Sequence, residues 1–244
     1  MMKKIIAVLV IFVCVGTALS AQINMSAGGG VLLDMSFGNG TKFANGDNGF
    51  TAGSRNISFG GYGFFDATYA EASISFAYGS LARTIKTKGN YKEEDADMGE
   101  DGEKIGSVTQ LGITLLGKYP IDIGPLTVFP LAGIGYNMVL SQKDKDKKAV
   151  KYGEISLDST KEPDESPLKW MSQFAILAGG GLDFDITSNL YLRGSVLLQL
   201  RFANKYQRDM VDFVEKLPGK EADDKWSTTL GFGPVLKVGV GYRF

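Results

Sequence analysis

Apolar and polar residues alternate with a period of two along most of this chain. Such alternation is typical of β-strands whose two faces meet different surroundings, and it differs from the helical period. Eight segments show it, and we expect strands over residues 23–37, 57–69, 70–81, 107–119, 126–140, 170–186, 190–202 and 230–244. Beyond the first residues, no apolar run is long enough for a membrane-spanning helix, which needs about 20 residues. The pattern therefore predicts an all-β fold.

One face of each expected strand is free of charge. In 230–244 every even position is apolar, whereas the other register holds glycines together with Lys237 and Arg243. When the more apolar register is taken as outward, we expect every charged strand residue to face inward, where they would form a luminal charge network: Asp34, Asp66, Glu71, Lys118, Asp183, Asp185, Arg193, Arg201, Lys237 and Arg243. A charge-free outer face is typical of strands that face lipid.

The lengths of the connections support the same architecture. We expect long links near 38–56, 82–106, 141–169 and 204–229, alternating with short ones near 69, 120–125 and 187–189. An up-and-down barrel with an even number of strands and both termini on the short-turn side has this alternation. Because backbone amides have no partner in lipid, the first strand should pair with the eighth. The prediction is an eight-stranded antiparallel up-and-down transmembrane β-barrel.

A soluble eight-stranded barrel or sandwich is the alternative, because one face of its strands packs in a core while the other meets water. Its outer face should carry Lys and Glu. Here the charged register is also rich in glycine, and aromatic residues recur near strand ends on the apolar register: Phe37, Tyr69, Tyr119, Trp170, Phe184 and Phe244. These features favour the membrane barrel. Pro130 and Pro234 are expected to occupy bulges, since proline donates no ladder hydrogen bond.

The N-terminus has the features of a secretory signal. Two lysines precede an apolar run, and small residues follow it at a cleavage site, so residues 1–21 are predicted to be a cleaved signal peptide and 22–244 the barrel domain. The single cysteine, Cys14, lies inside the signal, and lipidation there is a minor alternative. The mature chain would then have neither a disulfide nor a thiol nucleophile.

Charge and composition narrow the function classes. The 26 Lys and Arg nearly balance the 27 Asp and Glu, which argues against nucleic acid as a partner. Histidine is absent, so mechanisms that need an imidazole base or ligand are excluded. We expect no enzyme activity, no cofactor and no metal site.

The C-terminal residues Val238, Val240, Tyr242 and Phe244 form an alternating apolar run that ends on an aromatic. This run resembles the assembly signal of outer-membrane barrels, and with the segments 63–71 and 116–120 the chain resembles small barrels of the OmpX/OmpW type. The resemblance implies a location in the cell outer membrane, insertion by the barrel-assembly machinery and contact with outer-membrane lipid. It implies no single activity, because members are associated with small-solute passage, adhesion and envelope structure.

The expected function is therefore an envelope-structural role or a passive conduit for small solutes, with adhesion to a surface ligand through the long loops as the alternative. A plugged lumen is favoured over a gated path, because eight strands leave room for little besides side chains. If there is a path, Lys237 and Arg201 are the residues expected to face a solute, and Gln110, Gln173 and Gln199 would line a shallow vestibule.

Two loop segments carry concentrated charge. Residues 93–103 hold seven carboxylates without the spacing of an EF-hand, and a solvated loop is the expected state. Residues 143–151 are basic and 154–165 mostly acidic. A solvated loop is again the expected state, and folding on itself or binding anionic head groups is the alternative. The glycine runs 28–30 and 179–181 match no dinucleotide fingerprint and are expected to allow close packing.

Overall fold

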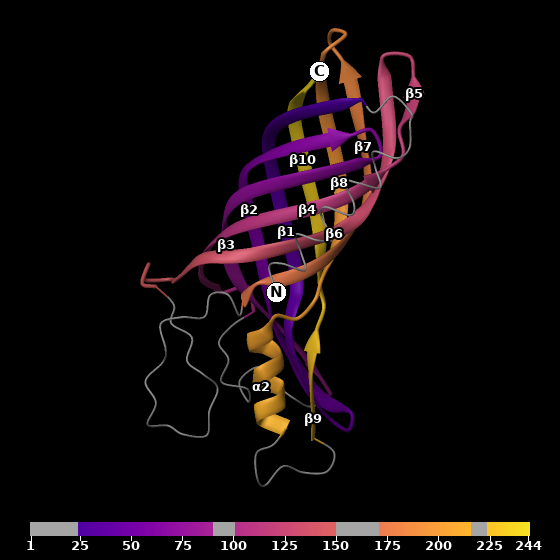
Figure 1. The fold of residues 1–244 in the computed structure, drawn as a ribbon. Helices are drawn as coiled ribbons and strands as arrows, with labels where there is room; N and C mark the ends of the chain where they lie inside the picture. Colours follow the sequence, from indigo (N-terminus) through magenta and orange to yellow (C-terminus); the bar gives the residue numbers. More distant parts are fainter. Residues whose placement is uncertain (1–23, 90–100, 150–170, 216–223) are drawn as a thin grey trace, which may run out of the picture.

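The computed structural model describes residues 24–89, 101–149, 171–215 and 224–244 (Figure 1). Their elements, in chain order, are β1 (Met25–Asn45), β2 (Asn48–Ala67), β3 (Ala70–Lys88), β4 (Lys104–Lys118), β5 (Ile121–Ile123), β6 (Leu126–Asp144), β7 (Gln173–Asp185), β8 (Leu190–Arg201), α2 (Lys205–Glu215), β9 (Asp224–Thr229) and β10 (Gly231–Arg243). The expected signal peptide falls outside these residues and stays a prediction.

Eight of these strands form a closed antiparallel ring. The order is β1, β2, β3, β4, β6, β7, β8 and β10, and β10 pairs with β1 to complete it. Figure 1 shows the strands wrapped at a steep tilt around one axis. Because the first and last strands of the ring pair along Ser26–Phe37, the ring has no free edge. The predicted eight-stranded antiparallel barrel is confirmed.

The long connections differ from the prediction. Residues 38–56, expected as a loop, are the outer halves of β1 and β2, joined by the two-residue turn Gly46–Asp47. Gly46 has a φ of 57°, the positive value that tight hairpin turns require. The region 204–229 contains α2 and β9, and β9 extends β10 by pairing with the outer half of β1.

These extensions build a folded platform beyond the long-loop end of the barrel. Phe43, Phe50 and Trp226 pack their rings together there, with centroids 5.0–5.8 Å apart. Helix α2 contacts β9 and has no buried residue. Its start is fixed by a reciprocal cap, in which the Gln207 amide donates to Asn204 Oδ1 and the Asn204 amide donates to Gln207 Oε1. Among the described residues, no helix is long and apolar enough to cross a membrane.

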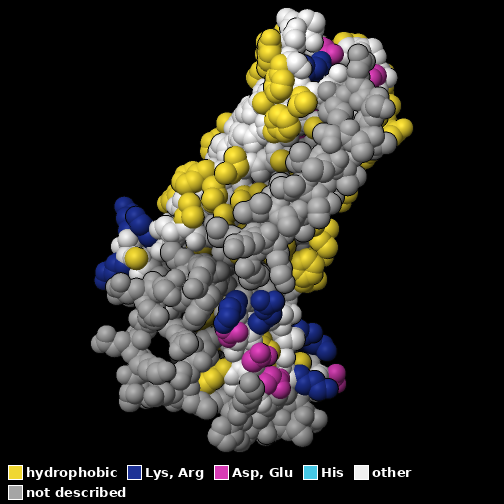
Figure 2. All heavy atoms as spheres, in the orientation of Figure 1, with side chains coloured by type: hydrophobic (Ala, Val, Ile, Leu, Met, Phe, Trp, Pro, Cys, Tyr) yellow, Lys and Arg dark blue, Asp and Glu magenta, His cyan; other side chains and the backbone are white. Residues whose placement is uncertain are grey.

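The outer wall of the barrel is apolar. Large side chains of the outward register are exposed, among them Leu198 (66%), Phe59 (62%) and Val238 (61%). Tyr69, Tyr119 and Phe244 are exposed at the short-turn end. Figure 2 shows hydrophobic side chains along the visible part of the barrel wall, with charge concentrated beyond them toward the long-loop end. So large an exposed apolar surface is stable against hydrocarbon and not against water.

The expectation of bulges at the two prolines was wrong. Pro130 pairs in register with Gly180 of β7, and Pro234 pairs in register with Leu198 of β8. Each proline instead lies where the pairing with its other neighbouring strand is interrupted, so no N–H is needed there. The β4–β6 pairing ends at Leu131, and the β1–β10 pairing skips Pro234. The register shifts lie elsewhere, at Ser36/Asn39, Leu81/Ala82 and Thr109/Gln110.

Candidate functional site

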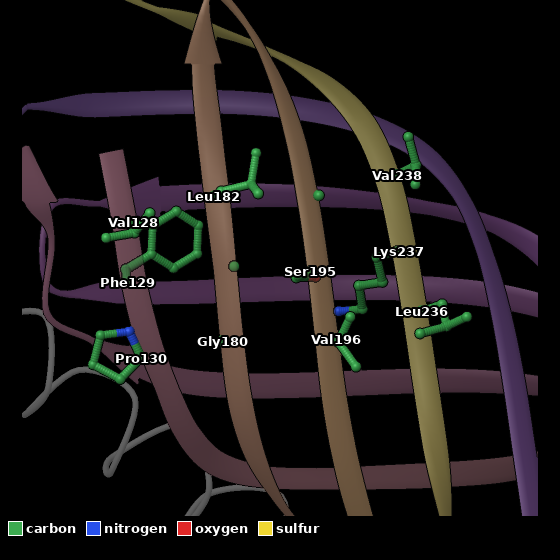
Figure 3. Close-up of a pocket in the computed structure, with 12 residues that line it drawn as sticks. Val128, Phe129, Pro130, Gly180, Leu182, Ser195, Val196, Leu236, Lys237 and Val238 are labelled. Carbon is green, nitrogen blue, oxygen red and sulfur yellow. The ribbon is translucent and has the colours of Figure 1, made fainter. Parts of the chain in front are cut away.

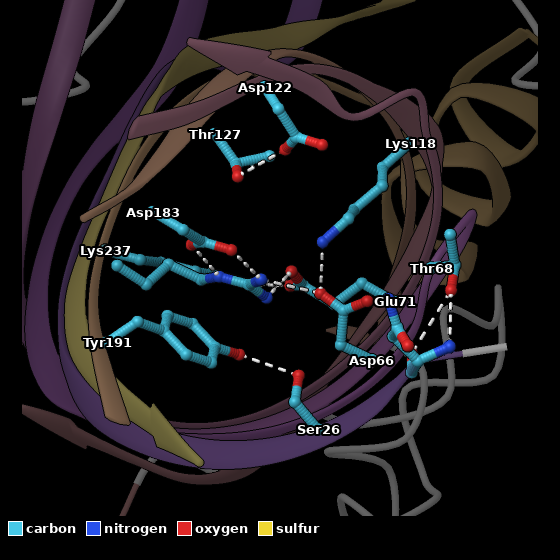
Figure 4. A network of polar contacts seen from close by, with 12 residues as sticks. Ser26, Asp66, Thr68, Glu71, Lys118, Asp122, Thr127, Asp183, Tyr191 and Lys237 are labelled. Atoms are coloured by element: carbon cyan, nitrogen blue, oxygen red, sulfur yellow. Dashed lines mark hydrogen bonds and ion pairs between the residues drawn. The ribbon is translucent and has the colours of Figure 1, made fainter. Parts of the chain in front are cut away.

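Arg193 of β8 lies at the centre of a buried ionic cluster inside the barrel. Figure 4 shows Asp66, Asp183 and Lys118 of this cluster pointing into the lumen. Its Nε and Nη2 donate to the two carboxylate oxygens of Asp183, both at 2.7 Å. Nη2 also lies 2.6 Å from Asp66 Oδ2, and Nη1 donates to Glu71 Oε2 at 2.9 Å. Asp183 is its direct cross-strand neighbour on β7, whereas Asp66 and Glu71 reach it from β2 and β3 across the lumen.

Two lysines complete this Arg193 cluster. Lys118 Nζ lies 2.5 Å from Asp66 Oδ2. Lys237 Nζ donates to Ser73 Oγ at 3.0 Å and lies 3.9 Å from Glu71 Oε1. The cluster therefore holds three carboxylates and three cations, and its side chains are almost completely buried. Because each charge has a partner of opposite sign, the cluster carries no net charge, as burial in a narrow barrel demands.

Aromatic rings close around the cations of the Arg193 cluster. The Arg193 guanidinium lies 4.5 Å from the centroid of Phe64, and Lys118 Nζ lies 4.5 Å from that of Phe129. Lys237 Nζ lies 5.2 Å from the centroid of the Tyr62 ring. Tyr191, fully buried, exchanges a 2.7 Å hydrogen bond with Ser26 across the seam between the first and last strands. These rings fill the space that the ion pairs leave.

A second ionic group lies nearer the long-loop end. Arg201 Nη2 pairs with Asp34 Oδ2 at 2.5 Å, and its Nε donates to Gln199 Oε1 at 3.0 Å. Gln199 Nε2 in turn donates to Asp34 Oδ1 at 2.5 Å. This Arg201 group is also neutral, so an entering solute would meet bonded side chains at this level, too.

The third ion pair closes the short-turn rim. Arg243 Nη1 donates to Asp185 Oδ1 at 2.7 Å, and both side chains remain partly exposed. All ten charged residues predicted to face inward are therefore placed inside the barrel or at its rim, and each has an ionic partner among the other nine. The structure separates them into the Arg193 cluster, the Arg201 group and the rim pair.

Apolar packing fills the rest of the lumen. One buried group joins Leu116, Phe129, Leu131, Ala175, Leu177, Leu197 and Val235, and another joins Leu32, Tyr62, Phe64, Ala77 and Tyr191. Between the two ionic levels, a cavity of about 20 Å³ lies beside Asp34, Gln199 and Lys237. That volume suits a single water molecule. Gln110 and Gln173, expected to line a vestibule, are buried.

A groove of about 660 Å³ runs along the outer wall where β6, β7, β8 and β10 lie side by side (Figure 3). Its sides are apolar, with Pro130, Val196 and Val238 exposed. Gly180 and Gly194, which have no side chains, line its floor. Strand pairing continues beneath it through Pro130, Gly180 and Val196. The groove is therefore a recess in the lipid-facing wall that does not open the lumen.

The inward aromatics and the outer platform were not anticipated from the sequence. Phe64 shares its register with Asp66, which was the available signal for an inward ring. The pair Asn204 and Gln207, three residues apart, was the signal for α2. Lys237 and Arg201, expected to face any solute, contact other luminal side chains instead. No described group of three or more ligating side chains is arranged to hold a metal ion, and most of the acidic segment 93–103 lies outside the described residues.

The predicted assembly residues lie on the outward face of β10. Val238, Val240, Tyr242 and Phe244 are all exposed, and the Phe244 amide donates to Met25 O across the seam. Their recognition by an assembly machinery stays a prediction.

No protein-family model matches the sequence, and no curated protein is significantly similar to it. Among solved structures, the outer membrane protein OprG from Pseudomonas aeruginosa aligns at 14% identity and a TM-score of 0.43 over 91% of this chain and 96% of its own. Ail, the attachment invasion locus protein of Yersinia pestis, aligns at 13% and 0.36 over 92% and 100%. The translocator domain of the autotransporter NalP from Neisseria meningitidis aligns at 12% and 0.25 over 99% and 96%.

The fold rests on the strand ring itself, since these identities and scores are low. A closed antiparallel ring with an apolar outer band and a polar, charge-bearing interior is the architecture of outer-membrane barrels. The chain is an eight-stranded barrel of this transmembrane type.

Proposed function

We propose that this protein is a closed, non-enzymatic barrel that anchors a folded platform at the outer-membrane surface and contributes to the structure of the envelope. The observation that carries the proposal is the Arg193 cluster, in which one guanidinium binds three carboxylates from three strands across the lumen. Ion pairs of this kind cross-link opposite walls of the barrel. They leave no charged luminal side chain unpaired in the described chain to guide a solute.

The same arrangement argues against the passive conduit. A solute that crosses would have to separate the Arg193 cluster, move its aromatic rings and then pass the Arg201 group. Breaking a buried ion pair costs about 3–5 kcal/mol, because a charge is left without compensation. A lumen held by several such contacts is expected to stay closed.

The full chain reconstituted in planar bilayers should therefore show no discrete conductance steps. The control is a variant in which Phe64, Phe129 and Tyr191 are each changed to Ala, since removing the rings opens space beside Arg193. Conductance steps in this variant, with a far-UV circular dichroism spectrum like that of the wild type, would show that the assay detects an open barrel. Regular conductance steps in the wild-type chain would contradict the closed barrel and restore the conduit.

Adhesion through the platform is the second candidate function. The supporting observation is that β1, β2, β9 and α2 form ordered structure beyond the apolar band, although the barrel ring does not need it. Replacing residues 205–215 with a Gly-Ser linker should leave the barrel folded, because α2 has no buried residue. If the platform is adhesive, vesicles that carry this variant should lose their binding to a glycoprotein-coated surface. Equal binding by both proteins would reject α2 as the binding element.

A further inference from the structure

Three successive rows of paired residues on the outer wall change from apolar to cationic. The first row is Phe59, Tyr78, Thr109 and Ser141; the second is Ile57, Ser80, Ser107 and Lys143; the third is Arg55 and Lys104, with the buried Ala82 paired between them. Members of a row are cross-strand partners on one face of the sheet, so their Cβ atoms lie about 4.5–5.5 Å apart. The rows follow β2, β3, β4 and β6 toward the long-loop end.

The apolar band ends across the first two rows, since Ile57 of the second row is still exposed. Phe59 and Tyr78 are 62% and 61% exposed and face outward. The hydroxyl groups of Ser80 and Ser107 come next, with Lys143 beside them in the second row. Arg55 and Lys104 follow in the third row, and all three cations are exposed. Figure 2 shows Lys and Arg side chains gathered at one edge of the molecule, where the yellow band ends toward the long loops.

These three cations have no ionic partner among the described residues, unlike the charged residues of the lumen. The carboxylates next to Lys104 and Lys143 in the sequence have other contacts. Glu103 Oε2 lies 3.8 Å from Arg83 and its Oε1 lies 3.7 Å from Lys145. Asp144 accepts hydrogen bonds from the backbone amides of Asp146 and Lys148, both at 2.9 Å. The patch of Arg55, Lys104 and Lys143 is therefore positively charged. The serine hydroxyls lie beside Lys143 and separate the row of Arg55 and Lys104 from the apolar band.

We infer that this patch binds the phosphate of an anionic membrane lipid in the leaflet next to the long loops. The order of the rows matches the order of groups in such a lipid: acyl chains lie against Phe59 and Tyr78, the glycerol region lies against the serines, and the phosphate lies against the cations. Lys and Arg near an anionic membrane surface each contribute to its attraction. The inference rests on the proposed membrane-spanning barrel, because only insertion brings the lipid phosphate to the height of these rows.

A lipid is favoured over a free anion by the position of the patch. The cations lie on the outer wall directly above the apolar band, where a bound phosphate remains attached to acyl chains that cover Phe59 and Tyr78. A soluble anion would gain only the electrostatic part of this contact, which salt screens within about 8–10 Å.

The test uses the full chain in detergent, titrated with phosphatidylglycerol or with zwitterionic phosphatidylcholine, and native mass spectrometry to count bound lipids. The wild type should retain phosphatidylglycerol in preference to phosphatidylcholine. The triple variant R55Q/K104Q/K143Q should bind phosphatidylglycerol at least about tenfold more weakly. The matched control K42Q/R208Q/K225Q removes the same charge from exposed positions on the platform and should bind as the wild type does.

Two further readouts separate the possible failures. Equal weakening in both triple variants, or no preference between the lipids, would overturn the inference while leaving the barrel in place. Displacement of phosphatidylglycerol by an equal concentration of inorganic phosphate would also overturn it, since the site would then recognise a free anion. Insertion into phosphatidylcholine vesicles is measured separately by protection from protease, and a wild-type chain that stays unprotected would overturn the proposed function and this inference together.

Discussion

Changing Arg193 to Met should lower the free energy of unfolding by about 3–5 kcal/mol. Methionine fills a similar volume, so the chief change is the loss of the positive charge. Asp183 would lose both of its short hydrogen bonds, whereas Asp66 would keep Lys118 and Glu71 would keep the 3.9 Å contact with Lys237. The cluster would then contain three carboxylates and two cations in a space closed to water.

Guanidinium chloride unfolding in phosphatidylcholine vesicles, followed by far-UV circular dichroism, measures this loss. Arg243→Met is the matched control, because that guanidinium pairs with one carboxylate, Asp185, and both side chains are about a third exposed. Exposed ion pairs contribute about 0–1 kcal/mol, so the control should change little. Adding Asp183→Asn to Arg193→Met restores charge balance and should recover part of the stability. Similar losses in the Arg193 and Arg243 variants would contradict the central role of the cluster.

The strand pattern was sufficient to predict the ring and the inward direction of its charges. Alternation at period two assigns each side chain to one face of the sheet. Because a charged side chain is destabilising on the face that lipid covers, it must face the lumen. Arg193 and Asp183 were both predicted inward for this reason. Their pairing with Asp66 and Glu71 was not predictable in detail, because contacts across the lumen depend on the tilt and stagger of the strands, which periodicity does not determine.

The outer platform could be predicted only in part. In water both faces of a strand tolerate polar residues, so β1 and β2 lose their apolar alternation beyond Ser36 although the pairing continues to Asn45 and Asn48. The turn residues Gly46 and Asp47 carried the signal for a hairpin that the hydropathy pattern did not. The short helix α2 was missed because its eleven residues lie in a region where the absence of strand periodicity indicated a loop.

The closing seam depends on glycine, and changing Gly30 to Val should prevent the barrel from closing properly. Gly30 of β1 lies opposite Gly239 of β10, and a Cβ atom on Gly30 would overlap the backbone of Val238 and Gly239. Backbone atoms have no alternative rotamer, so relief requires the two strands to separate. Gly28 has a related role, because a Cβ atom there would meet the Phe64 ring that packs on Arg193.

We expect Gly30→Val to cost about 3 kcal/mol or more, at the upper end of the range for overpacking, and to speed amide hydrogen exchange along the β1–β10 pairing. The matched control is Gly194→Val, a glycine of β8 on the lipid-facing groove where a Cβ atom meets nothing within 4 Å. Valine favours strands, so this control should be neutral or stabilising by up to about 1 kcal/mol. If both valines had the same effect on stability and exchange, close approach at the seam would not be what requires Gly30. If Gly30→Val alone speeds exchange, and does so selectively in β1 and β10, closure of the barrel depends on these glycines. Closure and the packing inside the lumen are then linked, because the glycines that let β1 and β10 meet also make room for the Phe64 ring beside Arg193.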